Sequence, residues 1–424
     1  MIGPRTSQSL AGACAADGEF GIAARFWTGG LRLEIGDAVA AITLTNGAVS
    51  AADPGKGEAG VITLIGTPPV WDKLLSARPP RFYNDIFNLT GPGGELAIEA
   101  EGVLLAQYFS AVMRTIELLR PADPGVGVAP KPKSQVGRID APVGRYVHLD
   151  LEGQDHRIYF EVAGSGIPLL MQHTAGCHGS QFRHLFERPE ITDHFRLIAY
   201  DLPFHGKSLP PVGPKWWESE YRLTAPFLRS VPVSLASALD LERPVFMGCS
   251  VGGLLALDLA LHHPDVFRAV ISLEGALNID VDIAGLDTLW HPQVSNEYKA
   301  RAMNSLMSPT SPEAYRKETS QVYAAGWPPA FLGDLYYYLV DYDLRETAAK
   351  IDTSKVAVHI LSGEYDASGT MEHGQAAHAA IAGSTWTGMT GVGHFPMSEN
   401  PDVFIGYLLP VLQTIRQDAK GRAK

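Results

Sequence analysis

The chain has 424 residues, which is long for one hydrophobic core and favours two domains or three. Apolar residues make up 46% and charged residues 19%, which is typical of a globular protein and excludes a largely disordered one. The formal net charge of −12 disfavours nucleic acid and anionic membrane surfaces as partners.

Cysteine usage and the lack of long apolar segments bear on the cellular compartment. Cys14, Cys177 and Cys249 are too few and too scattered for a disulfide framework or a CxxC-type zinc site. Residues 1–20 lack the apolar core of a signal peptide, and no apolar run approaches the roughly 20 residues of a membrane helix. We therefore expect a cytoplasmic protein without a membrane span, and the sequence is compatible with a homo-oligomer.

Residues 1–120 are predicted to form a small α+β domain. An Asn-Gly pair at 46–47 lies between alternating apolar and polar residues, which indicates a β-hairpin, and the segment 96–120 gives a helix that stops at Pro121. The phrases "GVITLIGTPPVWDKLL" and "LLAQYFSAVMRTIELLR" resemble the sterol-carrier-protein-2-like fold, whose members often hold a lipid-sized apolar cavity. An accessory domain for dimerisation or lid formation, without a ligand of its own, is the alternative.

A Pro-, Gly- and Lys-rich segment predicts an exposed linker, which we place at residues 121–140. Over residues 141–424, helices alternate with short apolar strands after an opening antiparallel pair. This pattern predicts an α/β domain with a mostly parallel sheet covered by helices on both faces. In such a sheet the chemistry collects at the carboxyl ends of the strands. The apolar strands are "IPLLMQH", "FRLIAYDLP", "PVFMGCS", "AVISLEG" and "VAVHILSGEYD".

The segment "FMGCSVGG" contains a G-x-S-x-G motif centred on Ser250. It follows a predicted strand and opens a predicted helix, the context in which a strained turn lifts a serine hydroxyl out of the sheet. Ser250 is thus a candidate nucleophile, with an ordinary turn as the alternative. At this point the chain resembles the α/β-hydrolase family over about residues 140–420. "YDLPFHGKS" matches the family's D-x-x-G-x-G-x-S turn, except that Phe204 replaces the first glycine.

The resemblance implies a Ser250, Asp366 and His394 triad in the family's chain order. His394 in "GVGHFPMSENP" would be the general base, and Asp366 in "LSGEYD" would fix its tautomer. Glu274 and Glu364 remain alternative acids, because each lies near the end of a predicted strand. The side chain of the neighbouring Cys249 is expected to point away from Ser250 and to pack inside this turn.

The stretch "MQHTAGCHGSQFRH" has no recognised metal-ligand spacing, so we expect neither a metal nor another cofactor. It follows a buried strand where the family carries its oxyanion loop. The resemblance implies that the backbone N–H groups of Ala175 and Val251 hold the oxyanion. Four side chains of this stretch are candidates for the substrate pocket: His173, Thr174, His178 and Arg183.

About 75 residues, from 276 to 352, separate two sheet strands, and in this family such an insert forms a helical cap. Its aromatic residues, among them the substrate-binding candidates Trp290 and Trp327, predict a small hydrophobic substrate with an apolar or aromatic acyl or alcohol group. We expect a serine hydrolase of carboxylesterase type that cleaves an ester, a lactone or a thioester through an acyl-enzyme. The alternatives are a carbon–carbon bond hydrolase with the same triad and a non-catalytic lipid-binding protein on this fold.

Overall fold

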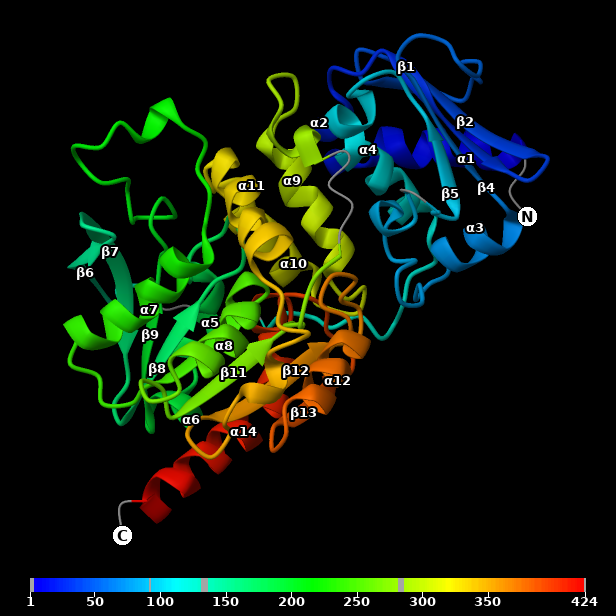
Figure 1. Ribbon diagram of the computed structural model, residues 1–424. Helices are drawn as coiled ribbons and strands as arrows, with labels where there is room; N and C mark the ends of the chain where they lie inside the picture. The colour runs from blue at the N-terminus through cyan, green and yellow to red at the C-terminus, as the bar shows by residue number, and fades with distance from the viewer. Residues whose placement is uncertain (1–3, 91–92, 131–135, 281–285, 423–424) are drawn as a thin grey trace. The chain divides into compact units, whose positions relative to one another are not determined.

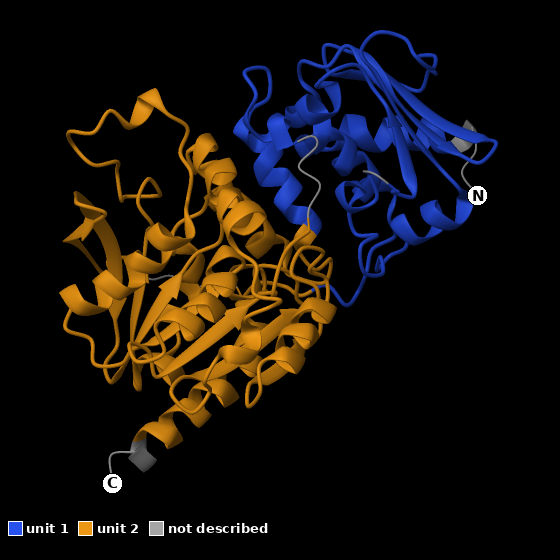
Figure 2. Cartoon of the chain, viewed as in Figure 1, with its two compact units in different colours: residues 1–126, 284–305 blue, residues 127–283, 306–424 orange. Residues whose placement is uncertain are grey.

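The computed structural model describes residues 4–90, 93–130, 136–280 and 286–422. The chain divides into two compact units, shown in Figure 2. Residues 1–126 and 284–305 form the N-terminal unit, and residues 127–283 and 306–424 form the second unit. Within the predicted linker, the described residues 121–130 and 136–140 contain no helix or strand.

The N-terminal unit is built on a five-stranded sheet in the order β3-β2-β1-β4-β5, in which only β1 and β4 are parallel (Figure 1). Asn46 and Gly47 both have positive φ, at 46° and 78°, and join β2 to β3 in the predicted hairpin. The core includes the buried side chains of Trp27, Trp71 and Phe109. The elements of this part are α1 (Pro4–Ala16), α2 (Gly18–Ala24), β1 (Gly29–Ile35), β2 (Ala38–Thr45), β3 (Ala48–Ser50), β4 (Val61–Gly66), α3 (Pro68–Leu74), η1 (Ile86–Asn88), β5 (Leu96–Glu99) and α4 (Leu104–Leu119).

A piece of the predicted cap belongs to the N-terminal unit. Its elements are η4 (Leu286–Trp290), α9 (Asn296–Ala302) and the beginning of η5 (Met303–Leu306). Tyr298 packs its ring edge-on against Phe109, with centroids 5.4 Å apart. Arg301 donates to Asp85 (3.2 Å) and to Glu117 (2.7 Å). Long-range packing therefore divides the insert, which sequence spacing alone presents as one block.

The second unit holds an eight-stranded sheet in the order β13-β12-β11-β10-β8-β9-β7-β6. Strands β8 to β13 pair in parallel, and β6 and β7 add the predicted antiparallel edge. The mostly parallel sheet predicted for this part of the chain is thus confirmed. Its strands are β6 (Val143–Leu151), β7 (Gln154–Ala163), β8 (Ile167–Gln172), β9 (Phe195–Tyr200), β10 (Val245–Cys249), β11 (Ala269–Leu273), β12 (Ala357–Gly363) and β13 (Thr385–Met389).

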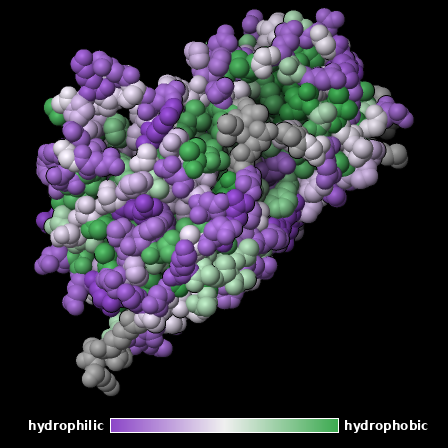
Figure 3. Space-filling model, in the orientation of Figure 1, coloured by the Kyte–Doolittle hydropathy of each residue, from purple (hydrophilic) through white to green (hydrophobic). Residues whose placement is uncertain are grey.

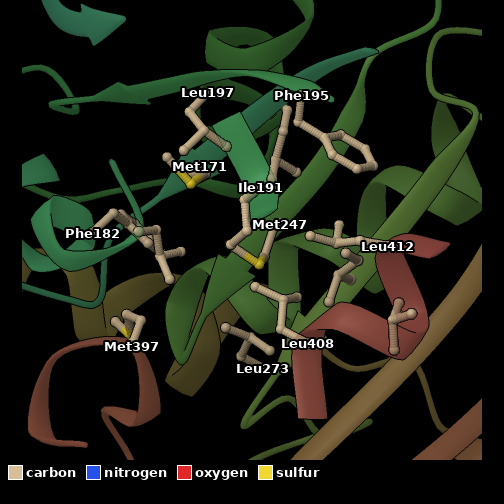
Figure 4. Packing of buried hydrophobic residues seen from close by; sticks show 14 of the residues in the cluster. Met171, Phe182, Ile191, Phe195, Leu197, Met247, Leu273, Met397, Leu408 and Leu412 are labelled. Carbon is tan, nitrogen blue, oxygen red and sulfur yellow. The ribbon is translucent and has the colours of Figure 1, made fainter. Parts of the chain in front are cut away.

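Both faces of this sheet are covered, since every residue of the central strands β10 and β11 is buried although successive side chains point to opposite faces. On one face, Met171, Leu197 and Met247 pack with Leu408 and Leu412 of the C-terminal helix (Figure 4). The helical elements of the unit are η2 (Gly179–Phe182), α5 (Arg183–Phe186), α6 (Pro189–Thr192), η3 (Trp216–Glu218), α7 (Ala225–Ala238), α8 (Val251–His262), α10 (Glu313–Ala324), α11 (Pro328–Tyr336), the π-helical η6 (Tyr337–Asp341), η7 (Ala348–Lys350), α12 (Met371–Ala380), α13 (Pro396–Glu399) and α14 (Pro401–Arg422).

The surface carries mixed polarity. On the face drawn in Figure 3, hydrophilic residues are interspersed with smaller hydrophobic areas. Among the described helices, none is long and apolar enough to cross a membrane.

Candidate active site

Ser250 lies at the carboxyl end of β10, at the start of α8. Its φ of 58° and ψ of −116° are unusual for a residue with a side chain, and its N–H donates to the carbonyl oxygen of Leu273 (3.0 Å). Such strain persists only where the surroundings enforce it, and it is concentrated at functional sites. Ser250 as a whole residue is only 9% exposed.

Close backbone contacts explain the glycines that flank Ser250. A Cβ at Gly248 would lie 2.2 Å from the carbonyl oxygen of Gly252, and one at Gly252 would lie 2.9 Å from that of Gln172. Both positions therefore require glycine if the strand is to turn this sharply into the helix. The contact with Gln172 also places the start of α8 directly beside the end of β8.

His394 and Asp366 form a buried pair at the ends of neighbouring strands. His394 Nδ1 lies 2.7 Å from Asp366 Oδ2, and the two residues are 4% and 0% exposed. The carboxylate also accepts the N–H groups of Ser368 (2.7 Å) and Gly369 (3.0 Å). Because an ionised carboxylate only accepts, this bond requires a proton on Nδ1 of His394, and in the neutral ring Nε2 is then an acceptor.

The two alternative acids have other partners. Glu274 is 1% exposed, and its Oε2 accepts the N–H of Gly363 (2.7 Å). Burial and the nearby charge of Asp366 raise the pKa of Glu274 well above its ordinary value, which favours a neutral acid. Glu364 accepts the N–H of Gly391 (2.9 Å). Asp366 is thus the carboxylate bonded to His394.

Cys249 is fully buried, and its thiol donates to the carbonyl oxygen of His394 (3.1 Å). Burial raises the pKa of this thiol well above its ordinary value, which disfavours a thiolate. Its surroundings agree with the packing role expected for it.

The loop after β8 runs beside the Ser250 turn, because β8 and β10 are neighbouring parallel strands. Within the described chain, the N–H of Ala175 donates to no protein acceptor, although the N–H groups of Thr174, Gly176 and Cys177 all do. Val251 is the first residue of α8, where a backbone N–H has no acceptor within its own helix. Both N–H groups proposed for the oxyanion are therefore available.

Two residues predicted to contact substrate, His173 and Thr174, are buried and bonded within the protein. His173 is 0% exposed, and its Nδ1 lies 2.8 Å from the carbonyl oxygen of Thr174 while its Nε2 accepts the N–H of Leu202 (3.1 Å). Thr174 is also 0% exposed and bonds through its hydroxyl to Gln181 and Tyr323. Both side chains therefore bond to protein groups around this loop, and their contact with substrate stays a prediction.

His178 and Arg183, the other two candidates from this stretch, have different surroundings. His178 lines a pocket of about 240 Å³ together with Tyr159, Glu161 and Lys207. The guanidinium of Arg183 pairs with Glu318 of α10, at 2.5 and 2.8 Å, so this residue anchors a helix of the insert.

The two tryptophans of the insert fall in different units. Trp327 begins α11 and lies among Phe204, Trp216 and Tyr221, with centroid distances of 5.7 to 6.4 Å. Trp290 is 51% exposed and belongs to the N-terminal unit.

Sequence reasoning overlooked Asp334. This residue is 0% exposed and accepts the N–H of Gly176 (2.7 Å), next to Ala175. The sequence does contain an indication of Asp334, because it is the one charged residue in the otherwise largely apolar segment "PPAFLGDLYYY". A carboxylate buried in such a segment requires hydrogen-bond or charge partners.

Comparison with known proteins agrees with this architecture. An uncharacterised protein of Mycobacterium tuberculosis (strain ATCC 25618 / H37Rv) is 25% identical over 289 residues, which cover 59% of this chain and 76% of that protein. A pimeloyl-[acyl-carrier protein] methyl ester esterase of Vibrio vulnificus (strain YJ016) is 22% identical over 59% of this chain and 96% of its own length.

Among solved structures, a thermophilic esterase from Thermogutta terrifontis superposes with a TM-score of 0.56 at 18% identity, covering 64% of this chain and 99% of that one. The model of the alpha/beta hydrolase family matches residues 169–406, which contain Ser250, Asp366 and His394 as well as the loop after β8. The chain belongs to the alpha/beta hydrolase family.

Proposed function

We propose that this protein is a serine hydrolase that cleaves a carboxylic ester, a lactone or a thioester of a hydrophobic molecule through an acyl-enzyme. The observation that carries the proposal is the strained conformation of Ser250 together with the buried His394–Asp366 pair at 2.7 Å. A serine hydroxyl is a weak nucleophile until a positioned base removes its proton, and this arrangement supplies the base and the group that orients it.

The residues take the following roles in the proposed reaction. His394 removes the proton of Ser250 as the hydroxyl attacks the carbonyl carbon, and then gives that proton to the leaving group. Asp366 holds His394 in the required tautomer and stabilises the imidazolium. The N–H groups of Ala175 and Val251 bind the oxyanion as charge develops. Water activated by His394 releases the acid and restores Ser250.

Aromatic residues near the oxyanion loop support a hydrophobic substrate. A Cβ at Gly176 would lie 2.7 Å from Cβ of Phe331, so α11 packs directly against this loop. Tyr323 of α10 lies edge-on to Phe395, the neighbour of His394, with centroids 5.4 Å apart. Apolar walls with few polar groups are typical of sites that bind small hydrophobic molecules.

The test is covalent labelling with a fluorophosphonate probe, followed by hydrolysis of p-nitrophenyl esters of graded acyl length. We expect labelling and hydrolysis by the native chain, and loss of both in Ser250→Ala. Cys249→Ser changes the neighbouring residue and is the matched control, which should keep the label. A native chain that neither reacts nor hydrolyses any ester would instead fit the non-catalytic lipid-binding protein.

Product analysis separates the proposed reaction from carbon–carbon bond hydrolysis. An ester yields an alcohol and an acid, a thioester yields a thiol, and a lactone yields a hydroxy acid. A vinylogous diketone yields a carbon acid in place of these leaving groups. Turnover of a diketone with Ser250-dependent release of a carbon acid, without ester hydrolysis, would replace the proposal by that alternative.

A further inference from the structure

Asp334 is a fully buried carboxylate near the end of α11 with three hydrogen-bond donors around it. Its Oδ2 accepts from the N–H of Gly176 (2.7 Å) and from His205 Nε2 (2.8 Å), and its Oδ1 accepts from the Tyr221 hydroxyl (3.2 Å). Asp334 is 0% exposed and the side chain of His205 is 1% exposed. A carboxylate with this many donors is held in one orientation.

The hydrogen-bond pattern fixes the charge of His205. Its Nδ1 lies 2.9 Å from the carbonyl oxygen of Pro203 and its Nε2 faces Asp334, so both ring nitrogens meet acceptors. Both must therefore carry protons, which makes the ring an imidazolium paired with the carboxylate. Burial opposes the charged form, but the charge and hydrogen bond of Asp334 raise the pKa of His205 overall. The positive charge of His205, in the loop after β9, thus balances the negative charge of the buried Asp334 on α11.

The bond to Gly176 connects this ion pair to the proposed oxyanion loop. Gly176 follows Ala175 directly and has a φ of 63°. The backbone of the α10–α11 turn lies against the same loop, since a Cβ at Gly326 would be 2.4 Å from the carbonyl oxygen of Gly176. The Gly176 N–H points at Asp334, so the carboxylate sets the orientation of the peptide next to the Ala175 N–H.

We propose that Asp334 is a positioning residue for the oxyanion hole. Its carboxylate, charged and oriented by His205 and Tyr221, holds the Gly176 peptide and thereby aims the Ala175 N–H at the reacting carbonyl oxygen. The α10–α11 part of the insert then takes part in the reaction by positioning the oxyanion loop. This inference rests on the proposed ester hydrolysis and adds a residue to it.

The test compares Asp334→Asn with the native chain using the best p-nitrophenyl ester and a trifluoromethyl ketone with the same acyl chain. The ketone forms a tetrahedral adduct that fills the oxyanion hole, whereas KM for the ester reports ground-state binding. We expect kcat to fall by about 10- to 100-fold, with KM changed less than about 3-fold. The inhibition constant of the ketone should rise by the same factor as kcat/KM falls.

Asp341→Asn is the matched control. Asp341 lies in the same insert and accepts the N–H of Ala225 (2.9 Å), so it links the insert to α7 without touching the oxyanion loop. We expect this variant to keep kcat and the inhibition constant of the ketone. If Asp334→Asn folds and behaves like Asp341→Asn, or if it raises KM alone, the inference is overturned.

A milder variant covers the case in which Asp334→Asn does not fold. Tyr221→Phe removes one of the three donors to Asp334 and should lower kcat and weaken ketone binding in parallel, by about 2- to 5-fold. Unchanged values would overturn the inference. Failure of the proposed function looks different, because then the native chain would lack Ser250-dependent hydrolysis.

Discussion

At the scale of single residues, burial separates the roles of two neighbouring carboxyl groups. Asp366 bonds to His394 and to two backbone N–H groups, whereas Glu274 has the N–H of Gly363 and a pKa raised by burial and by Asp366. We predict that Asp366→Asn lowers kcat by about 10³- to 10⁴-fold, because the amide favours the wrong histidine tautomer. Steady-state hydrolysis of a p-nitrophenyl ester measures this.

Glu274→Gln is the control for that measurement, because glutamine resembles a neutral carboxylic acid in shape and can still accept the N–H of Gly363. We expect it to keep kcat within about 10-fold, and Glu364→Gln to do the same. An inactive Glu274→Gln beside an active Asp366→Asn would move the acid of the site to Glu274.

The glycines beside Ser250 give a second prediction at this scale. Gly248→Ala places a Cβ 2.2 Å from a backbone oxygen, so the turn must shift and Ser250 with it. We expect a loss of about 1–3 kcal/mol in the free energy of unfolding and a loss of fluorophosphonate labelling. Urea denaturation and labelling test both.

Gly406→Ala is the matched control, because a Cβ there meets nothing within 4 Å and the residue lies inside α14. Helix propensity predicts a gain of up to about 1 kcal/mol and unchanged labelling. Equal losses of unfolding free energy and of labelling in the two variants would show that the turn at Ser250 has no special steric requirement.

At the scale of elements, helix α10 is fixed to the core by a cluster of charges. Arg183 and His184 both bond to Glu318. Burial would raise the pKa of Glu318, but the hydrogen bonds from His184 and Arg183 lower it to about 2. A lowered folded-state pKa stabilises the protein above the ordinary pKa of 4.5, and this stabilisation is lost as the pH falls toward 2.

We therefore predict that Glu318→Gln lowers the free energy of unfolding by about 1 kcal/mol at pH 7, a value reduced for the solvent exposure of Arg183. The difference from the native chain should shrink below about pH 4.5, as urea denaturation at several pH values would measure. Glu187→Gln alters a more exposed neighbour of Arg183 and should have almost no effect. A difference for Glu318→Gln that is independent of pH would contradict the electrostatic origin.

Elements with a strong local pattern could be predicted from the sequence. The buried strands and α8 follow from continuous apolar runs, and the hairpin follows from Asn46-Gly47. Strand β13 was overlooked because "TWTGM" carries no such run and lies at the edge of the sheet, partly exposed. The helix predicted over 96–120 was wrong at its start, because residues 96–99 form strand β5. The role of Asp334 could not be predicted, because its partners come from loops after β8 and β9 that are more than 110 residues away in the chain.

At the scale of the whole molecule, the two units share the insert between β11 and β12. The sequence places residues 276–352 in one cap, yet residues 286–305 pack with the N-terminal unit. Asn84 and Asn88 both donate to the carbonyl oxygen of Ser305, at 2.7 and 2.8 Å, across more than 200 positions of sequence. Local patterns contain no information about such contacts. The likeness of the N-terminal unit to the sterol-carrier-protein-2-like fold stays a prediction.

This division makes a prediction about truncation. Deleting residues 1–126 alone leaves Tyr298 without Phe109, and Arg301 without Asp85 and Glu117. An unpaired, formerly buried arginine and an exposed apolar helix face both favour aggregation. We expect that variant to aggregate in size-exclusion chromatography.

A second variant, which also replaces residues 286–305 by a Gly-Ser linker of equal length, should elute as a folded protein and keep fluorophosphonate labelling at Ser250. Equal behaviour of the two variants would mean that α9 does not depend on the N-terminal unit.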